Sequence, residues 1–129
     1  MVSEKKGSKM LNKLLEIKTQ LKVYHWQTKL YSRHLAADKF LTKAEDIIDN
    51  IIEVYQGKYG VIDLNNKNKN VKIDNISNAD ITKYLMAIKK YLEEDYVKIL
   101  NKNVNTDLLN LRDELLASIN TTIYLFNQK

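Results

Sequence analysis

The chain of 129 residues contains no proline and only three glycines. Proline removes a backbone donor and breaks helices, and glycine is the next least favourable residue in a helix interior. A chain with so few of both can carry long, uninterrupted helices. Its length also suffices for one domain with a substantial hydrophobic core.

Apolar residues recur at intervals of three and four positions in four segments, which is the spacing of amphipathic helices. The predicted helices span residues 10–28, 32–55, 81–99 and 106–126. Gly57 and Gly60 mark the end of the second helix, and Ser77 and Asp80 have the spacing of a capping box before the third. Four helices of similar length predict an all-α four-helix bundle over residues 10–129.

A long segment, residues 58–79, separates the second helix from the third, and its centre is rich in Asn and Lys. Short alternating pieces at residues 62–64 and 71–73 are compatible with a small hairpin, and a long irregular crossover is the alternative. Such a crossover lets the second and third helices run parallel, as in the up-down-down-up order of ferritin-like bundles.

The composition excludes several classes of site. The chain has no cysteine, which rules out disulfides, zinc–thiolate sites and cysteine nucleophiles. The N-terminus has no apolar signal region, and no apolar run approaches the length of a membrane span. We therefore expect a soluble, cytoplasmic protein without a membrane partner.

The first nine residues are charged and lie before the first predicted helix. We expect residues 1–9 to form a flexible basic arm, because chain ends without apolar anchors are poorly ordered. Its cations are Lys5, Lys6 and Lys9, and the net charge of the chain is +5. A solubilising tail is one interpretation of this arm, and weak contact with DNA phosphates is the other.

Acidic residues and a histidine share one strip of the second predicted helix. At about 100° per residue from His34, four acidic residues fall between about 20° and 100°: Asp38, Glu45, Asp49 and Glu53. A solvated helix face is the simpler interpretation. The alternative is a metal site, because like charges at i,i+4 repel, and imidazole with carboxylate suits iron, zinc or manganese.

The stretch YHWQTKLYSRH, residues 24–34, holds both histidines and the only tryptophan. In an unbroken helix His25 and His34 would lie ~180° apart and could not share an ion. A metal site therefore requires a turn near residues 30–32, with Ser32 as the N-cap. Taken alone, His25 is a packed helix-end histidine or a ligand, and Trp26 is a core or interface aromatic.

The His-Trp pair, the following His-x3-Asp and the later Asp-x3-Glu together resemble the ferroxidase signature of Dps-like mini-ferritins. The step of eleven residues from Asp38 to Asp49 is the spacing of that family. The resemblance covers residues 24–55, and the stretch around the histidines also resembles short uncharacterised proteins of phages and large viruses. It implies a ferritin-like bundle for iron storage and protection against oxidants.

The resemblance also implies how iron is held. The implied metal ligands are His25, His34 and Asp38 of one subunit, with Asp49 and Glu53 of its two-fold mate. The metal would be non-haem iron, bound either as a single ion or as a di-iron pair, and zinc and manganese are the alternatives. Trp26 would lie close to the metal. A homo-oligomer follows, which is at least a two-fold dimer, with a cage as the larger alternative. A lysine-bearing tail in this family can contact DNA.

Helix geometry independently requires two chains for such a cluster. Asp38 and Glu53 are fifteen residues apart on one helix, which is about 22 Å at ~1.5 Å per residue. Two antiparallel copies related by a two-fold axis bring the two ends of the strip together. The rival hypotheses are a non-catalytic interaction bundle and a DNA-associated protein. Whether the chain is an enzyme acting on ferrous iron stays open.

Overall fold

The computed structural model describes residues 4–64 and 70–128, and within them the regular secondary structure is entirely helical. Two long helices come first, α1 (Glu4–Gln27) and α2 (Tyr31–Tyr59), and α5 (Thr106–Phe126) comes last. The third helix is a continuous rod of α3 (Ile81–Lys90), the π-helical η1 (Tyr91–Asp95) and α4 (Tyr96–Lys98). Four helices and no strand among the described residues confirm the predicted four-helix bundle.

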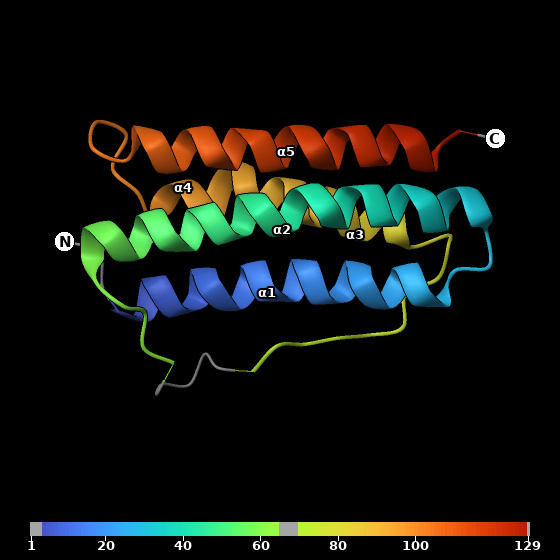
Figure 1. Cartoon of the computed structure of the whole chain (residues 1–129), viewed down its shortest axis with the longest axis horizontal. Helices are drawn as coiled ribbons and strands as arrows, with labels where there is room; N and C mark the ends of the chain where they lie inside the picture. The colour runs from blue at the N-terminus through green and yellow to red at the C-terminus, as the bar shows by residue number, and fades with distance from the viewer. Residues whose placement is uncertain (1–3, 65–69, 129) are drawn as a thin grey trace.

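Figure 1 shows that α2 and α3 begin at the same end of the bundle, beside the last turns of α1 and α5. At this end Arg33 of α2 donates to the carbonyl oxygens of Asn78, just before α3, and Phe126, at the end of α5. At the other end Lys58 of α2 donates to the Asp107 carboxylate at the start of α5, at 2.7 Å. The two central helices therefore run in the same direction, opposite to α1 and α5.

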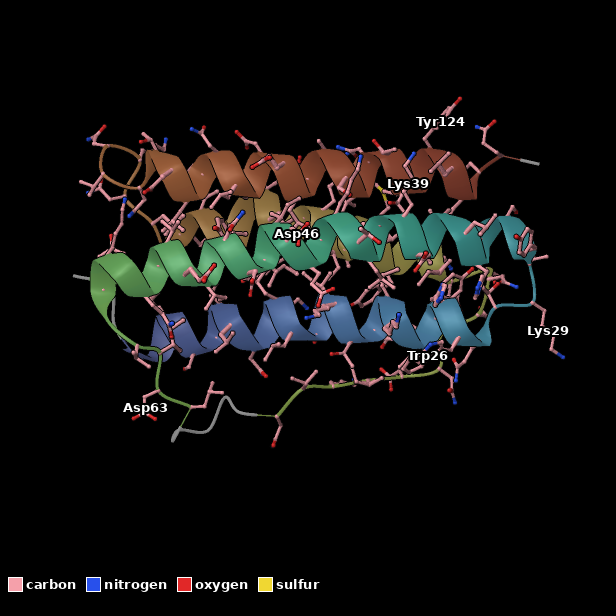
Figure 2. The ribbon with its side chains drawn as sticks, viewed as in Figure 1. Trp26, Lys29, Lys39, Asp46, Asp63 and Tyr124 are labelled. Atoms are coloured by element: carbon pink, nitrogen blue, oxygen red, sulfur yellow. The ribbon has the colours of Figure 1, made fainter. Side chains whose placement is uncertain are left out.

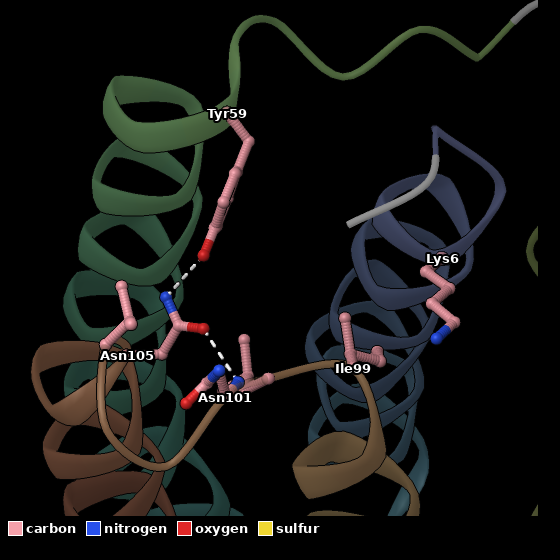
Figure 3. A pocket seen from close by; sticks show the side chains of 7 residues that line it. Lys6, Tyr59, Ile99, Asn101 and Asn105 are labelled. Atoms are coloured by element: carbon pink, nitrogen blue, oxygen red, sulfur yellow. Dashed lines mark hydrogen bonds between the residues drawn. The ribbon is translucent and has the colours of Figure 1, made fainter. Parts of the chain in front are cut away.

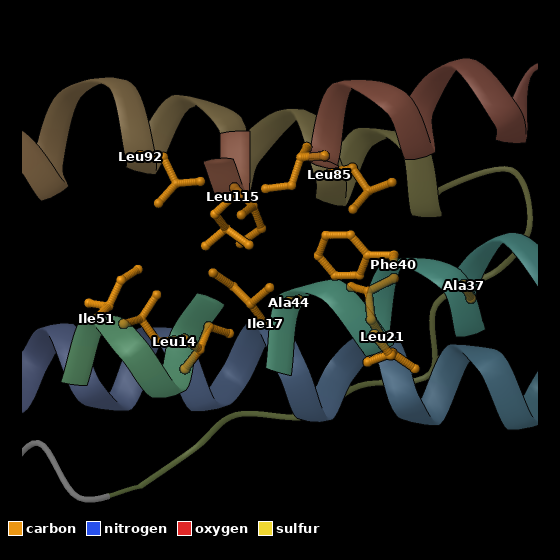
Figure 4. Packing of buried hydrophobic residues seen from close by; sticks show 14 of the residues in the cluster. Leu14, Ile17, Leu21, Ala37, Phe40, Ala44, Ile51, Leu85, Leu92 and Leu115 are labelled. Carbon is orange, nitrogen blue, oxygen red and sulfur yellow. The ribbon is translucent and has the colours of Figure 1, made fainter. Parts of the chain in front are cut away.

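The core lies between the four helices and is built from the apolar stripes that the periodicity predicted (Figure 4). Residues of this core with at most 1% exposure include Leu14, Ile17, Leu21, Phe40, Ala44, Ile51, Leu85, Leu92, Leu115 and Ile119. Burying one such aliphatic or aromatic side chain contributes roughly 1.5–3 kcal/mol. The packing of these stripes is therefore the main force that positions α1 beside α2.

The crossover between α2 and α3 is held on α1 by amide side chains. Gln20 donates from Nε2 to the carbonyl oxygen of Asp74 at 2.8 Å, and its Oε1 accepts from the Asp74 backbone N–H at 2.9 Å. Asn12 donates to the carbonyl oxygen of Asn70 at 2.7 Å. The described part of the crossover is irregular and contains no strand, so a hairpin is not formed there; residues 65–69 lie outside the described part.

The start of α1 differs from the flexible arm expected over residues 1–9. Residues 4–9 are already helical, and Gly7 and Ser8 are buried. Glycine permits this packing, because a Cβ at position 7 would lie 2.9 Å from the hydroxyl oxygen of Tyr55 on α2. Residues 1–3 lie outside the described part. No helix within the described residues is long and apolar enough to cross a membrane.

Candidate metal centre

The candidate centre is built around the turn between α1 and α2. The helix is broken over residues 28–30, slightly before the expected position at residues 30–32. The prediction of Ser32 as the N-cap is wrong: Leu30 occupies that position, without a side-chain cap. The Thr28 hydroxyl instead accepts the backbone N–H of Leu30 at 3.2 Å, which stabilises the turn locally. This break reverses the chain direction and brings His25 and His34 together.

The two histidine rings stack face to face across the turn. Their centroids are 3.9 Å apart and their planes are inclined by 19°. Nδ1 of His25 lies 2.8 Å from the carbonyl oxygen of His34, and Nδ1 of His34 lies 2.8 Å from the carbonyl oxygen of His25. The His25 carbonyl is in the last turn of α1, where it has no partner within its own helix. The histidine pair therefore links the end of α1 to the start of α2, independently of any role in metal binding.

These reciprocal hydrogen bonds determine where each ring carries its proton. A carbonyl oxygen only accepts, so both Nδ1 atoms must be donors. In the neutral form each Nε2 then keeps an in-plane lone pair. A histidine that donates from one nitrogen to a carbonyl and presents the other is arranged as metal-binding histidines are.

The stacking also limits how the two rings can bind metal. A metal–imidazole bond of ~2.1 Å lies in the plane of the ring. The two stacked rings have centroids 3.9 Å apart and planes inclined by only 19°, so these planes meet far beyond that length. A single ion therefore cannot lie in both ring planes. Unless the rings rotate out of the stacked arrangement, His25 and His34 can bind only two separate, neighbouring ions and not the same ion.

The carboxylates of the predicted set lie along the outer face of α2. Asp38 is one turn from His34, whereas Asp49 and Glu53 lie in the distal half of the helix, and all three are exposed. None of the three side chains has a hydrogen-bond or ion-pair partner among the described residues. Glu45 on the same strip pairs with Lys18 of α1 at 3.3 Å and is therefore occupied.

One chain alone does not assemble the predicted ligand set. Within the described residues no group of three or more His, Asp or Glu side chains is placed to hold an ion. The fold brings His25 and His34 into contact and leaves Asp38 nearby on the helix. It keeps Asp49 and Glu53 away, because α2 is a continuous helix over residues 31–59.

Exposed apolar side chains surround the histidine pair. Trp26 is 67% exposed, with the ammonium of Lys22 5.6 Å from its ring centroid, so it is not a core aromatic (Figure 2). Tyr31 is 73% exposed and lies parallel to the His34 ring, with centroids 6.4 Å apart. Leu30 and Leu35 are about half exposed. Sequence reasoning missed Tyr31, although its spacing of three residues from His34 places both on one helix face.

The lysines of the predicted basic arm, for which weak DNA contact was one of two interpretations, belong to the first turns of α1. Lys6 and Lys9 are exposed there, at the end of the bundle opposite the histidine pair. The side chain of Lys5 lies outside the described part. These cations are therefore carried by an ordered helix in the described residues, and they are remote from the candidate metal centre.

Comparison with known proteins gives one match. A family profile described as a family of unknown function (DUF5856) matches residues 25–126. The matched range begins at His25 and includes every other predicted metal ligand. No curated protein and no solved structure matches the chain.

Proposed function

This chain belongs to a family of unknown function, DUF5856, and we propose that it is a Dps-like, ferritin-like protein that binds and oxidises ferrous iron between two subunits. The observation that carries the proposal is the His25–His34 pair, whose hydrogen bonds leave both Nε2 atoms available for metal. A further support is the helix order, since a single long crossover between parallel central helices is an arrangement of ferritin-like bundles.

The positions of the other ligands on α2 support a shared site. His34 and Glu53 are equally far from the point between Lys43 and Ala44, and Asp38 and Asp49 are also equally far from it. A two-fold axis through that point, with the α2 helices antiparallel, sets His34 beside Glu53 of the partner subunit. The same operation sets Asp38 beside Asp49 of the partner subunit. One symmetry operation thus completes two equivalent sites.

The proposed sites have a chemical reason to need metal. Asp38 and the two partner carboxylates would repel one another in an empty dimer, since no lysine is interleaved among them. A divalent cation between them converts that repulsion into attraction, so metal should stabilise the dimer. Ferrous iron is the substrate, and hard carboxylate ligands favour its ferric product. Positions not taken by protein ligands admit oxygen or peroxide.

Exposed apolar side chains near the histidines would become buried if a second copy of the chain packed against this face of α2. In the antiparallel arrangement Leu35 faces Ile52 of the partner subunit, because these positions are also equally far from the axis. Leu35 is 49% exposed in the single chain, and Trp26, which follows His25 on α1, is 67% exposed. Apolar side chains packed around the two proposed metal sites would exclude water from the ions. Zinc and manganese are the alternative metals for the same ligand set.

The first experiment measures assembly and oxidation together. The wild-type chain should shift from monomer toward dimer in sedimentation when Fe²⁺ or Zn²⁺ is added, and it should oxidise Fe²⁺ faster than buffer does. Asp49→Asn/Glu53→Gln should lose both effects. Glu93→Gln/Glu94→Gln is the matched control, because these two exposed acids lie on the third helix, away from the strip of α2. A chain that stays monomeric and binds metal at one-chain stoichiometry refutes the proposal.

Subunit mixing tests whether the ligands come from two chains. His25→Ala/His34→Ala and Asp49→Asn/Glu53→Gln should each be inactive alone. Mixed in equal amounts, they form heterodimers in which one of the two sites has all its ligands, so about one quarter of the wild-type activity should return. No recovery, despite confirmed heterodimers, contradicts a shared site. Metal binding without oxidation instead favours a non-catalytic helical interaction protein of the same fold.

A further inference from the structure

A hollow lies between the middle of α2 and the middle of α5, and it is called the α2–α5 hollow below. Its volume is about 440 Å³, which falls within the ~300–1,000 Å³ range of small-molecule sites. None of the proposed iron ligands lines it, so it is separate from the iron site. Its lining residues are Lys43, Asp46 and Ile47 of α2 and Glu114, Ala117, Ser118 and Thr121 of α5.

The lining of the α2–α5 hollow includes a buried hydroxyl without a partner. Ser118 is only 8% exposed. Its carbonyl oxygen accepts the Thr122 hydroxyl at 2.8 Å, but its own hydroxyl makes no hydrogen bond within residues 4–64 and 70–128. Buried side-chain hydroxyls in proteins usually have a hydrogen-bond partner. A polar ligand in the hollow would supply the missing partner of Ser118.

A second hollow, where α2 ends, does not share this property (Figure 3). Its buried polar side chain is Asn105, which donates from Nδ2 to the Tyr59 hydroxyl oxygen at 2.7 Å. Oδ1 of Asn105 accepts the backbone N–H of Asn101 at 2.9 Å. Both ends of this buried amide therefore have protein partners, unlike the Ser118 hydroxyl in the α2–α5 hollow.

Two opposite charges in the lining of the α2–α5 hollow do not pair with each other. Lys43 and Asp46 are three residues apart on α2, which places their Cβ atoms about 5–6 Å from each other. Neither side chain has an ion-pair or hydrogen-bond partner in the described part of the chain. Both charges are therefore available to a ligand. Several pairs with the same spacing do form ion pairs: Lys13–Glu16 at 3.1 Å, Asp80–Lys83 at 3.6 Å and Asp95–Lys98 at 3.5 Å.

We propose that the α2–α5 hollow binds a small amino-acid zwitterion, with its carboxylate at Lys43 and its ammonium at Asp46. Each end of the ligand then meets a charge of the opposite sign, and hydrogen bonds between charged groups are about twice as strong as neutral ones. Glu114 adds a second negative charge to the lining, which disfavours a ligand that has a carboxylate and no ammonium. Ile47 and Ala117 offer apolar contacts to the short chain between the two ends.

γ-Aminobutyrate is the probe, because its methylene groups hold two opposite charges apart. NMR titration of the metal-free full chain should show saturable binding, with amide shifts concentrated in residues 43–47 and 114–121. Butyrate lacks the ammonium and butylamine lacks the carboxylate, so each should bind about tenfold more weakly. Equal binding of either compound, shifts concentrated elsewhere, or shifts that never saturate would each overturn the proposal.

Substitutions test the two charged ends separately, and both positions are exposed. Lys43→Met should lower the affinity for γ-aminobutyrate to that for butylamine, without weakening butylamine. Asp46→Asn should lower the affinity for γ-aminobutyrate about tenfold, and Ser118→Ala, which removes a neutral hydrogen bond, should cost less. Lys83→Met is the matched control, because Lys83 is an exposed lysine of α3 that does not line the hollow. Unchanged affinity in Lys43→Met or in Asp46→Asn overturns the proposal.

Discussion

Replacing Gln20 by Met should loosen the crossover from α1. Gln20 is only 2% exposed, and its amide makes both hydrogen bonds that a neighbouring β-strand would make with the backbone of Asp74, at 2.8 and 2.9 Å. Met has a similar length and fills the same space, but it makes neither bond. A hydrogen bond of this kind contributes about 1 kcal/mol net, so Gln20→Met should lower the free energy of unfolding by about 2 kcal/mol.

Urea unfolding followed by circular dichroism measures this loss, and hydrogen exchange locates it. The Asp74 amide should exchange much faster in Gln20→Met, because its acceptor is gone. Gln27→Met is the matched control: Gln27 is exposed and makes one bond, 2.9 Å to the side chain of Asn75. Its loss should stay below about 0.5 kcal/mol. If Gln20→Met unfolds like wild type and Asp74 stays protected, the amide pairing does not hold the crossover.

The remaining predictions concern the helices and the buried tyrosines. Gly57→Ala should raise the free energy of unfolding in urea by about 0.5–1 kcal/mol, because a Cβ at this position of α2 meets no other atom. Gly7→Ala should not stabilise the protein, since its Cβ would lie 2.9 Å from the Tyr55 hydroxyl oxygen. Burial, aided by the charge of Glu16, raises the pKa of Tyr84 and Tyr91 well above the usual value of about 10. A raised folded-state pKa adds stability below about pH 10 that declines at higher pH, so Tyr84→Phe should reduce the alkaline loss seen in pH-dependent unfolding. An alkaline loss of stability that is equal in Tyr84→Phe and in the wild type would contradict this assignment.

Local periodicity was sufficient to predict most of the helices. The last helix matches its predicted span of residues 106–126, and the third ends within one residue of its prediction. The first and second helices extend further than predicted. Gly7 lies inside α1 because it packs closely on Tyr55, and α2 continues through Gly57 to Tyr59. A glycine at a helix end cannot be distinguished from one at a close helix contact without the neighbouring helix.

The acidic strip on α2 could also be predicted from the sequence, because residues three and four apart always share one face of a helix. The stacking of His25 on His34 could not be predicted from spacing, since it depends on where α1 ends. The turn at residues 28–30 has no glycine or proline to mark it. It is held instead by Arg33, which bonds backbone oxygens 45 and 93 residues further along the chain. Helical faces follow from spacing alone, whereas this break and the stacked histidines follow from contacts that only the packed bundle brings together.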